Sequence, residues 1–319
     1  MTLAQCAEIE FIPKEGRPFY INKVNNINIE SSWKMLTGIA EITLPRNTAD
    51  FDNFKVKEIF KRETQCIIKL GYDGKLKEEF RGYISQVSAD FPIKIKLEDE
   101  MRRLKKIPVN FAAKSIGLKE FIQKHVTDYP IDIDADIQLG AVRFSKTTLG
   151  EVLDKLQKDM CIYGFIRNEK LTIGKPYSDA GNTHHFDLER NCVDNNLNYL
   201  SKEDRLVKII GKSIFGKGEK MEFEFGDKDA NETINWTFTY REKKELEDAV
   251  KKMYNDRKKD GFDGSFTTFG LDSLKHGEKV KLTSSLYPDR EGTYYVDRVQ
   301  KSFGKDGYRQ VIELGQKAY

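Results

Sequence analysis

The chain has 319 residues, of which 39% are hydrophobic and 33% are charged, and its 54 basic and 51 acidic residues leave a formal net charge of +3. This length suffices for about two to four domains, and such a composition with 11% aromatic residues argues against disorder. The near-balance of charge gives no support for binding to nucleic acid or to a membrane surface.

The first hundred residues are expected to form β-structure. Gly82 lies inside a long strand-like stretch and predicts a bulge or a sharp bend there. A short charged helix, Glu98–Lys105, is expected to follow, so residues 1–106 are interpreted as one β unit. Alternating apolar and polar residues predict the strands Glu8–Ile12, Asn26–Ser32, Gly38–Leu44, Gln65–Leu70, Glu79–Phe91 and Ile93–Leu97.

The hydrophobic period changes over residues 107–176, which are interpreted as a small α+β domain. Thr148 and Glu151 have the spacing of a capping box in front of an apolar helical stripe. A polar linker, Pro176–Thr183, is expected to end the domain. The expected elements are the helices Ser115–Val126 and Leu149–Met160, the strand Ile131–Ile137, and a hairpin of Ile162–Arg167 with Lys170–Ile173.

Strand patterns return in residues 177–319. One long helix, residues 241–259, is expected among them, with Gly261 just past its end. The predicted strands are Asn195–Tyr199, Leu206–Phe215, Lys220–Phe225, Ile234–Thr239, Ser265–Phe269, Lys279–Thr283, Thr293–Phe303 and Tyr308–Leu314.

Two stretches of the chain, Ile68–Phe91 and Val280–Phe303, follow one pattern at a constant offset of 212 residues. The match suggests two similar β units within the chain. The alternative is chance, because apolar and polar alternation is common to all half-buried strands. The matched residues are Ile68-Lys69-Leu70 with Val280-Lys281-Leu282, Tyr83-Ile84 with Tyr295-Val296, Val87 with Val299, and Phe91 with Phe303.

Motifs that could bind phosphate or metal are incomplete. Gly211–Lys217 has the spacing of a phosphate-binding loop, but the next residue is Gly218 and a strand follows, so a hairpin turn is expected. Asp132, Asp134 and Asp136 resemble the start of a calcium loop without its glycine and glutamate, and are expected to form a solvated surface. His184-His185 has no third ligand nearby in the sequence, so no metal site and no cofactor is expected.

No catalytic signature is recognised either. Glu98 with Glu100, or Asp227 with Asp229, could in principle serve glycoside hydrolysis, but charged turns are far commoner. Tyr308-Arg309 and Arg81 with Tyr83 combine aromatic and basic residues, as single-stranded nucleic-acid sites do. The balanced charge weakens that reading.

The termini and the cysteines favour synthesis in a reducing compartment. Cys6, Cys66, Cys161 and Cys192 are scattered, without a C-x-x-C pair. The N-terminus lacks an apolar stretch of signal-peptide length, and no run approaches the roughly 20 apolar residues of a membrane span. We therefore expect synthesis in the bacterial cytoplasm and no membrane partner.

Several of these stretches resemble a known family, the tail-hub or baseplate-hub proteins of contractile phages and prophages. This is the late control protein D group, which is related to the N-terminal part of type VI secretion spike proteins. The resemblance spans almost the whole chain and is strongest in its last sixty residues. It is carried by Leu70–Gly74, Phe80–Ile84, Glu98–Met101, Leu104-Lys105, Thr148-Leu149, Val152-Leu153, Gly264–Gly270, His276-Gly277, Gly304 and Gly307–Gln310.

The resemblance implies two similar β-barrels, in 1–106 and 177–319, on either side of the α+β domain. It further implies a homotrimer whose six barrels form a ring, which would join a hexameric tail tube to a trimeric spike. The spike would be a separate polypeptide, because the chain ends soon after its last predicted strand. The expected partners are the tube, the spike and other baseplate proteins of a phage tail or injection particle, without specific binding of nucleic acid. The family supplies no catalytic residues.

Two other functions remain open from the sequence. The chain could be a stand-alone β-barrel that binds carbohydrate or single-stranded nucleic acid. It could also be a tail-associated cell-wall hydrolase using the carboxylates named above.

Overall fold

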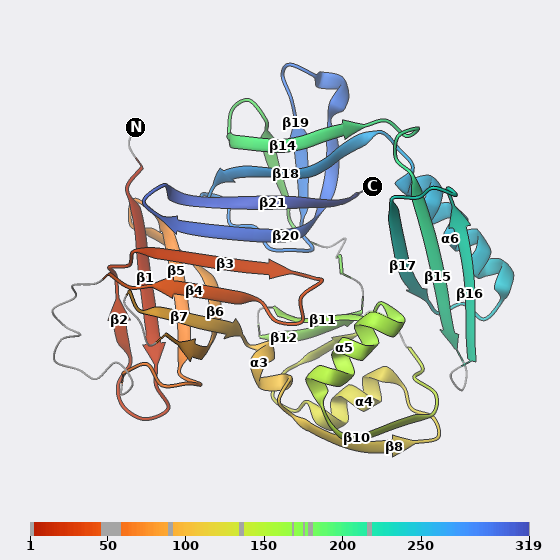
Figure 1. Cartoon of the computed structure of the whole chain (residues 1–319), viewed down its shortest axis with the longest axis horizontal. Helices are drawn as coiled ribbons and strands as arrows, with labels where there is room; N and C mark the ends of the chain where they lie inside the picture. The colour runs from red at the N-terminus through yellow and green to blue at the C-terminus, as the bar shows by residue number, and fades with distance from the viewer. Residues whose placement is uncertain are drawn as a thin grey trace. The chain divides into compact units, whose positions relative to one another are not determined.

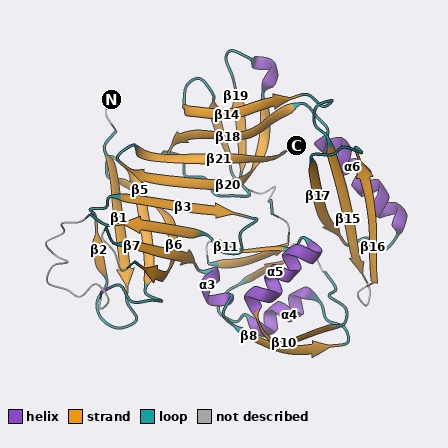
Figure 2. Cartoon of the chain, in the orientation of Figure 1, coloured by secondary structure: helices purple, strands orange, loops and turns teal. Residues whose placement is uncertain are grey.

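The structure, a computed structural model, describes residues 3–45, 59–88, 92–133, 137–167, 169–174, 176–177, 181–215 and 219–318. Strands dominate, with a few helices between them (Figure 2). The expectation of a mainly β chain with an α+β insert and one long helix is confirmed. No helix in these ranges is both long and apolar enough to cross a lipid bilayer.

The chain packs as two compact units. The first, called here the sheet unit, contains residues 1–102, 179–197 and 264–315. The second, called here the mixed unit, contains residues 103–178, 198–263 and 316–319. Each unit combines three separate segments of the chain, so these units are not the same kind of division as consecutive domains. The expected three-domain division at 1–106, 107–176 and 177–319 stays a prediction.

The sheet unit is built from one extended sheet (Figure 1). Alternate residues of its strands point inward, so that Ile9, Ile27, Ile42 and Ile95 are fully buried. Its strands in chain order are β1 (Gln5–Ile12), β2 (Phe19–Ile21), β3 (Asn26–Ser32), β4 (Ile39–Thr43), β5 (Gln65–Tyr72), β6 (Lys75–Val87), β7 (Lys94–Asp99), β13 (Thr183–Asp187), β14 (Cys192–Leu200), β18 (Gly261–Phe269), β19 (Lys279–Thr283), β20 (Gly292–Gly304) and β21 (Gly307–Lys317).

The bulge expected at Gly82 of strand β6 does not lie at that residue, and the alternative of a sharp bend stays a prediction. The irregular pairings fall elsewhere, since Glu79 is passed over between β5 and β6 and Ser85 between β6 and β7. Gly82 instead allows the neighbouring strand to approach, because a Cβ at this position would lie 2.2 Å from the backbone oxygen of Glu98. The bulges thus lie on either side of a close contact between two backbones.

Two further expectations were wrong in detail. Glu98 belongs to β7, so the short helix is confined to α3 (Met101–Leu104). Strand β13, which includes His184 and His185, begins at Thr183, the last residue of the expected linker, and residues 178–180 of that linker are outside the described ranges. Strand β13 was missed because its Thr-His-His-Phe-Asp sequence has little apolar alternation.

In the mixed unit, helix α5 (Leu149–Met160) begins as the capping box predicts. The hydroxyl of Thr148 accepts a hydrogen bond from the backbone N–H of Glu151, whose carboxylate accepts one from the N–H of Thr148. These contacts lower the pKa of Glu151, together with a hydrogen bond from the hydroxyl of Thr147, which is the main cause. The other elements of this first part of the mixed unit are α4 (Leu118–His125), β8 (Pro108–Ala113), β9 (Ile131–Ile133), β10 (Val142–Thr148), β11 (Tyr163–Arg167) and β12 (Lys170–Gly174).

A second part of the mixed unit is a three-stranded sheet covered by the long helix α6 (Lys243–Arg257). The sheet has the order β16 (Glu219–Gly226), β15 (Val207–Phe215), β17 (Glu232–Phe238). Leu246 and Val250 of α6 pack on Val207 and Ile209 of β15. Gly211 lets the helix approach, because a Cβ there would lie 2.2 Å from a methyl of Val250.

Candidate functional surface

The sheet unit consists of two halves with the same strand order. In the first half, the order is β3-β4-β7-β6-β5-β1, with β2 beyond β1. In the second half, it is β14-β18-β21-β20-β19-β13. The correspondence extends the sequence repeat, which covered only β5, β6, β19 and β20, to strands without recognisable sequence similarity. The structure therefore favours duplication over chance alternation.

The two halves differ at their first strands, in one loop, and in the segment that the second half inserts between β14 and β18. Strand β1 pairs with β5 in the antiparallel sense, whereas β13 pairs with β19 in the parallel sense. A tight turn joins β5 to β6 through Asp73 and Gly74, whereas residues 284–291 join β19 to β20. Similarity of order thus coexists with local additions to the second half.

One strand, β20, joins the two halves. Its first residues pair with β19, with Val280 opposite Tyr294. Its last residues pair with β3 of the first half, from Arg298 opposite Ser32 to Phe303 opposite Ile27. The hydrogen-bonded sheet is therefore continuous from one half to the other, as Figure 1 shows for β21, β20, β3 and β4.

A buried ion pair lies beside this join. The side chain of Glu79, the bulged residue of β6, is 1% exposed and contacts the ammonium group of Lys301 on β20, whose side chain is 5% exposed. The hydroxyl of Ser273 donates to Glu79 at 2.6 Å and accepts from Lys301 at 2.8 Å. Burial lowers the pKa of Lys301, and the facing carboxylate opposes that shift. The pair ties side chains of both halves together in the interior.

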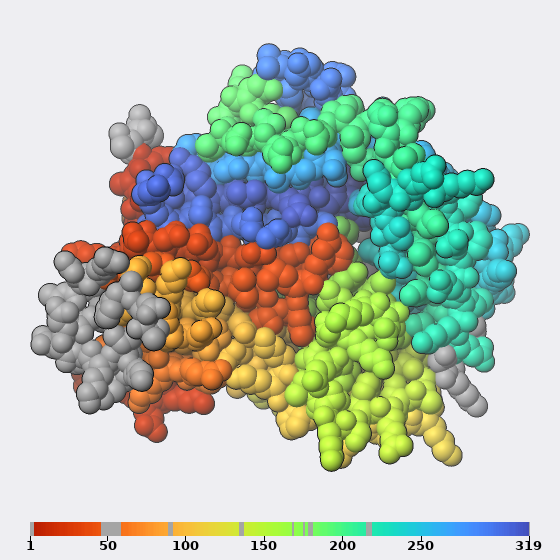
Figure 3. All heavy atoms as spheres, viewed as in Figure 1, coloured from red at the N-terminus to blue at the C-terminus, as the bar shows by residue number. Residues whose placement is uncertain are grey.

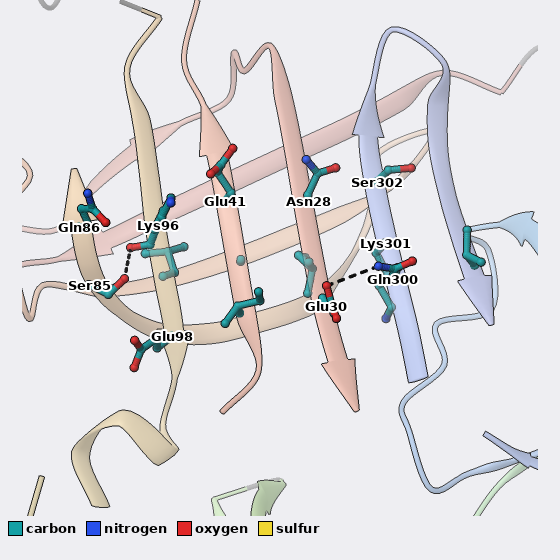
Figure 4. Close-up of a pocket in the computed structure, with 15 residues that line it drawn as sticks. Asn28, Glu30, Glu41, Ser85, Gln86, Lys96, Glu98, Gln300, Lys301 and Ser302 are labelled. Atoms are coloured by element: carbon teal, nitrogen blue, oxygen red, sulfur yellow. Dashed lines mark hydrogen bonds between the residues drawn. The ribbon is translucent and has the colours of Figure 1, made fainter. Parts of the chain in front are cut away.

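The opposite face of the join is polar and hollowed (Figure 4). We call it the polar face. It encloses about 570 Å³ and is formed by strands of both halves. It arises from strand alternation: Asn28, Glu41 and Lys96 point outward between neighbours that point into the core. Its polar and charged lining residues are Asn28, Glu30, Glu41, Ser85, Gln86, Lys96, Glu98, Gln300 and Ser302; Lys301 also borders it, although its side chain is the buried one that contacts Glu79.

Charges on and near the polar face are largely paired. Arg298 contacts Glu30 at 2.7 Å and Glu313 at 3.7 Å, and Glu98 contacts Arg102 at 3.1 Å. Gln300 donates a hydrogen bond to Glu30 at 3.4 Å, drawn in Figure 4. A face of this kind offers hydrogen bonds and balanced charge, and its chemistry suits contact with water or with polar partners.

The carboxylates considered from the sequence make structural contacts where the structure describes them. Asp227 accepts hydrogen bonds from the backbone N–H of Val207, from Tyr254 and from Lys258, which holds its pKa down, and thereby anchors α6 to its sheet. Glu98 pairs with Arg102. Among the residues with described positions, no group of three or more His, Cys, Asp or Glu is arranged to hold a metal ion.

The three incomplete motifs have separate outcomes. Gly211–Phe215 of the phosphate-loop motif belong to strand β15, which pairs antiparallel with β16 up to Phe215 opposite Glu219, so the expected hairpin is confirmed; residues 216–218 are outside the described ranges. Asp132 forms an ion pair with Lys170 at 2.7 Å, and Asp134 and Asp136 lie outside the described ranges. His184 is 3.4 Å from Glu278.

Comparison with known proteins identifies the fold. The chain matches no protein-family model and no curated sequence. A tail protein from Neisseria meningitidis MC58 has a similar structure over 99% of this chain and 97% of its own, with a TM-score of 0.61 and 10% identity. A 43 kDa tail protein of prophage MuSo2 from Shewanella oneidensis gives a TM-score of 0.60 at 12% identity, over 98% of both chains.

A component of the type VI secretion system of E. coli is also similar. It has a TM-score of 0.59 and 10% identity over 93% of this chain and 74% of its own, and is described as similar to the bacteriophage T4 tail proteins gp27 and gp5. The chain thus has the fold of phage tail and secretion-spike proteins, as its sequence motifs suggested. At such low identity, the likeness concerns the fold.

Proposed function

We propose that this chain is a structural hub of a contractile injection machine. Three copies form a ring that joins a hexameric tail tube to a trimeric spike and contacts other baseplate proteins. The single observation that carries the proposal is the repeated strand order of the sheet unit. Three chains with two equivalent halves each present six similar positions, so a three-fold ring can meet a six-fold one. The role requires binding and no catalysis.

The join between the halves indicates how the ring could close. Within the chain, β20 of the second half pairs with β3 of the first. The equivalent strands are β6 in the first half and β14 in the second, because both halves share one order. A ring of equivalent contacts then requires β6 of one chain to pair with β14 of the next.

The edges needed for this contact are present. Strand β14 stands at the end of the sheet order, and side chains 193–197 of that strand are half-buried or exposed. On the edge of β6 that faces β5, backbone pairing ends near Ile84. Gln86 and Val87 therefore extend past the last residue of β6 that pairs on this edge. Exposed strand edges are templates for pairing with another chain.

Mass photometry over a range of concentrations tests the assembly. We expect a species of three times the monomer mass, favoured by addition of the tube and spike proteins from the same genome. A strict monomer under all these conditions would refute the hub. A pure trimer that binds neither tube nor spike would refute the adaptor role alone.

Disulfide trapping tests the proposed seam. Gln86→Cys is combined in turn with Asn195→Cys, Asn196→Cys or Asn198→Cys in a variant whose native cysteines are serines. At least one register is expected to give an oxidised link between chains, because paired strands bring Cβ atoms within disulfide reach. Gln86→Cys with Asn28→Cys is the control, and no link is expected, since β3 already pairs with β20.

A further inference from the structure

The second half of the sheet unit carries an apolar tip that the first half lacks. Residues 284–291 connect β19 to β20 and end in a short 3-10 helix, Pro288–Arg290. Leu286 is 71% exposed and Tyr287 is 51% exposed, among the largest exposures of big apolar side chains in the described ranges. The loop appears in Figure 3 as a blue projection beside the green segment between β13 and β14.

The base of this loop is fixed by one carboxylate. Glu189, between β13 and β14, accepts hydrogen bonds from the hydroxyl of Ser284 at 2.7 Å and from the backbone N–H and hydroxyl of Ser285 at 2.8 and 3.2 Å. The hydroxyl of Ser284 in turn accepts a hydrogen bond from the N–H of Tyr287. The guanidinium of Arg290 lies 4.3 Å from the centre of the Tyr287 ring. The apolar tip is therefore presented on a held base.

Exposed leucine and tyrosine side chains on a loop whose base is fixed by hydrogen bonds favour a binding role. Binding then orders few additional side chains, and aromatic residues on a fixed support are common at the centres of interfaces. Within its own chain, the tip leaves both side chains largely in water. A partner with an apolar recess would remove them from it.

Symmetry selects the partner. The corresponding connection in the first half is the turn at Asp73 and Gly74, which has no room for such a tip. A trimer therefore displays the tip three times, not six. A three-fold partner can engage all three copies equivalently, whereas a six-fold partner would meet the tip at only alternate subunits. Three linked contacts also strengthen one another by avidity.

We infer that Leu286 and Tyr287 form the docking tip for a trimeric protein with apolar recesses. The inference rests on the proposed trimer and assigns a partner to one particular loop. It assigns different parts of the chain to the two proposed partners. Strands common to both halves contact the hexameric tube, and the loop found only in the second half contacts the trimeric protein.

Photo-cross-linking in assembled particles tests the inference. Tyr287 is replaced by p-benzoylphenylalanine in the producing bacteria, and the linked protein is identified by mass spectrometry. A link to a protein that is itself trimeric in isolation supports the assignment. A link to the tube subunit, a link to another copy of this chain, or no link to any protein overturns it.

A substitution gives the second measurement. Particles with Leu286→Ser and Tyr287→Ser are expected to lose about tenfold or more of the trimeric protein relative to tube protein. Leu271→Ser is the matched control, because Leu271 is 49% exposed in a different loop of the same unit, and it is expected to leave that ratio unchanged. Equal ratios in both variants overturn the inference. Mass photometry of the variant with both serine substitutions distinguishes failure of this inference from failure of the proposed hub. If the hub is correct, that variant still forms a trimer, whether or not the loop binds the partner.

Discussion

The two halves of the sheet unit show which features a duplicated fold retains. Both keep the order of six strands, and both bury alternate apolar residues. The same position can nevertheless hold different side chains, since Gly82, opposite Cys66 in the first half, has its counterpart in the fully buried Val296, which hydrogen-bonds to Glu278 in the second. The second half also gains a loop, residues 284–291, and an insertion between β14 and β18. Strand order is thus retained where side chains are not, because many apolar combinations fill a similar core.

The largest expected effect comes from the ion pair between the halves. Lys301→Met leaves Glu79 charged and buried without its partner, so the free energy of unfolding should fall by about 3–5 kcal/mol in urea titration. The double variant Glu79→Leu with Lys301→Met should recover most of that loss, because it removes both charges. A single substitution that costs less than about 1 kcal/mol would show that the pair does not hold the halves together.

A glycine substitution tests the close approach of β6 and β7 at Gly82, a packing feature of the first half. Gly82→Ala places a Cβ against the backbone of Glu98 and should reduce the free energy of unfolding by about 1–3 kcal/mol. Gly164→Ala is the control, because its Cβ would meet its nearest neighbour, Ile173, at 3.6 Å, an ordinary contact. Equal stability of both variants, measured by thermal unfolding, would contradict the close approach at Gly82.

Shortening the loop makes the second half resemble the first. Replacing residues 284–291 by Asp-Gly, as in the turn between β5 and β6, should change the free energy of unfolding by only about 1 kcal/mol, because loop length has a weak effect on stability. The trimer should persist and the trimeric partner should be lost. A variant that no longer forms a trimer would place the loop between subunits instead.

The smallest effect is a dependence of the loop on pH. The pKa of Glu189 is lowered by its hydrogen bonds, of which that from Ser284 is the largest cause. A lowered pKa means that the contribution to stability is present above the usual glutamate value and is lost as pH falls through the pKa of the folded state. The protection factor of the Ser285 amide, which compares its exchange rate with the intrinsic rate at the same pH, should therefore fall at acidic pH, while the turn at Asp73 and Gly74 serves as the reference. Glu189→Gln should show a low protection factor at all pH values, and a high protection factor in that variant would exclude the carboxylate as the brace.

Local signals predicted the elements well. Asn26–Ser32, Leu149–Met160 and Lys279–Thr283 have the bounds expected from alternation, helical spacing and the capping box. The missed strands β2, β8, β10 and β13 are short, polar or irregular, and their pairing partners decide their conformation. Strand propensity depends strongly on such context.

The candidate surface was less accessible from the sequence. Glu79 looked like one polar residue among several on an alternating strand, and only the bulge turns it inward toward Lys301, more than two hundred residues away. The polar face similarly combines Glu41 and Lys96 with Gln300 of a distant strand. No local pattern contains that pairing.

The sequence by itself determined the β-rich character, most strand positions, the caps and turns, and a repeat limited to β5, β6, β19 and β20. These features depend on side-chain periodicity and on backbone preferences over a few residues. The tertiary structure decided the complete six-strand duplication, the choice of β3 as the partner of β20, and the apolar tip found in only one half. Such choices depend on contacts between distant segments, whose free energies are summed only when the chain is folded.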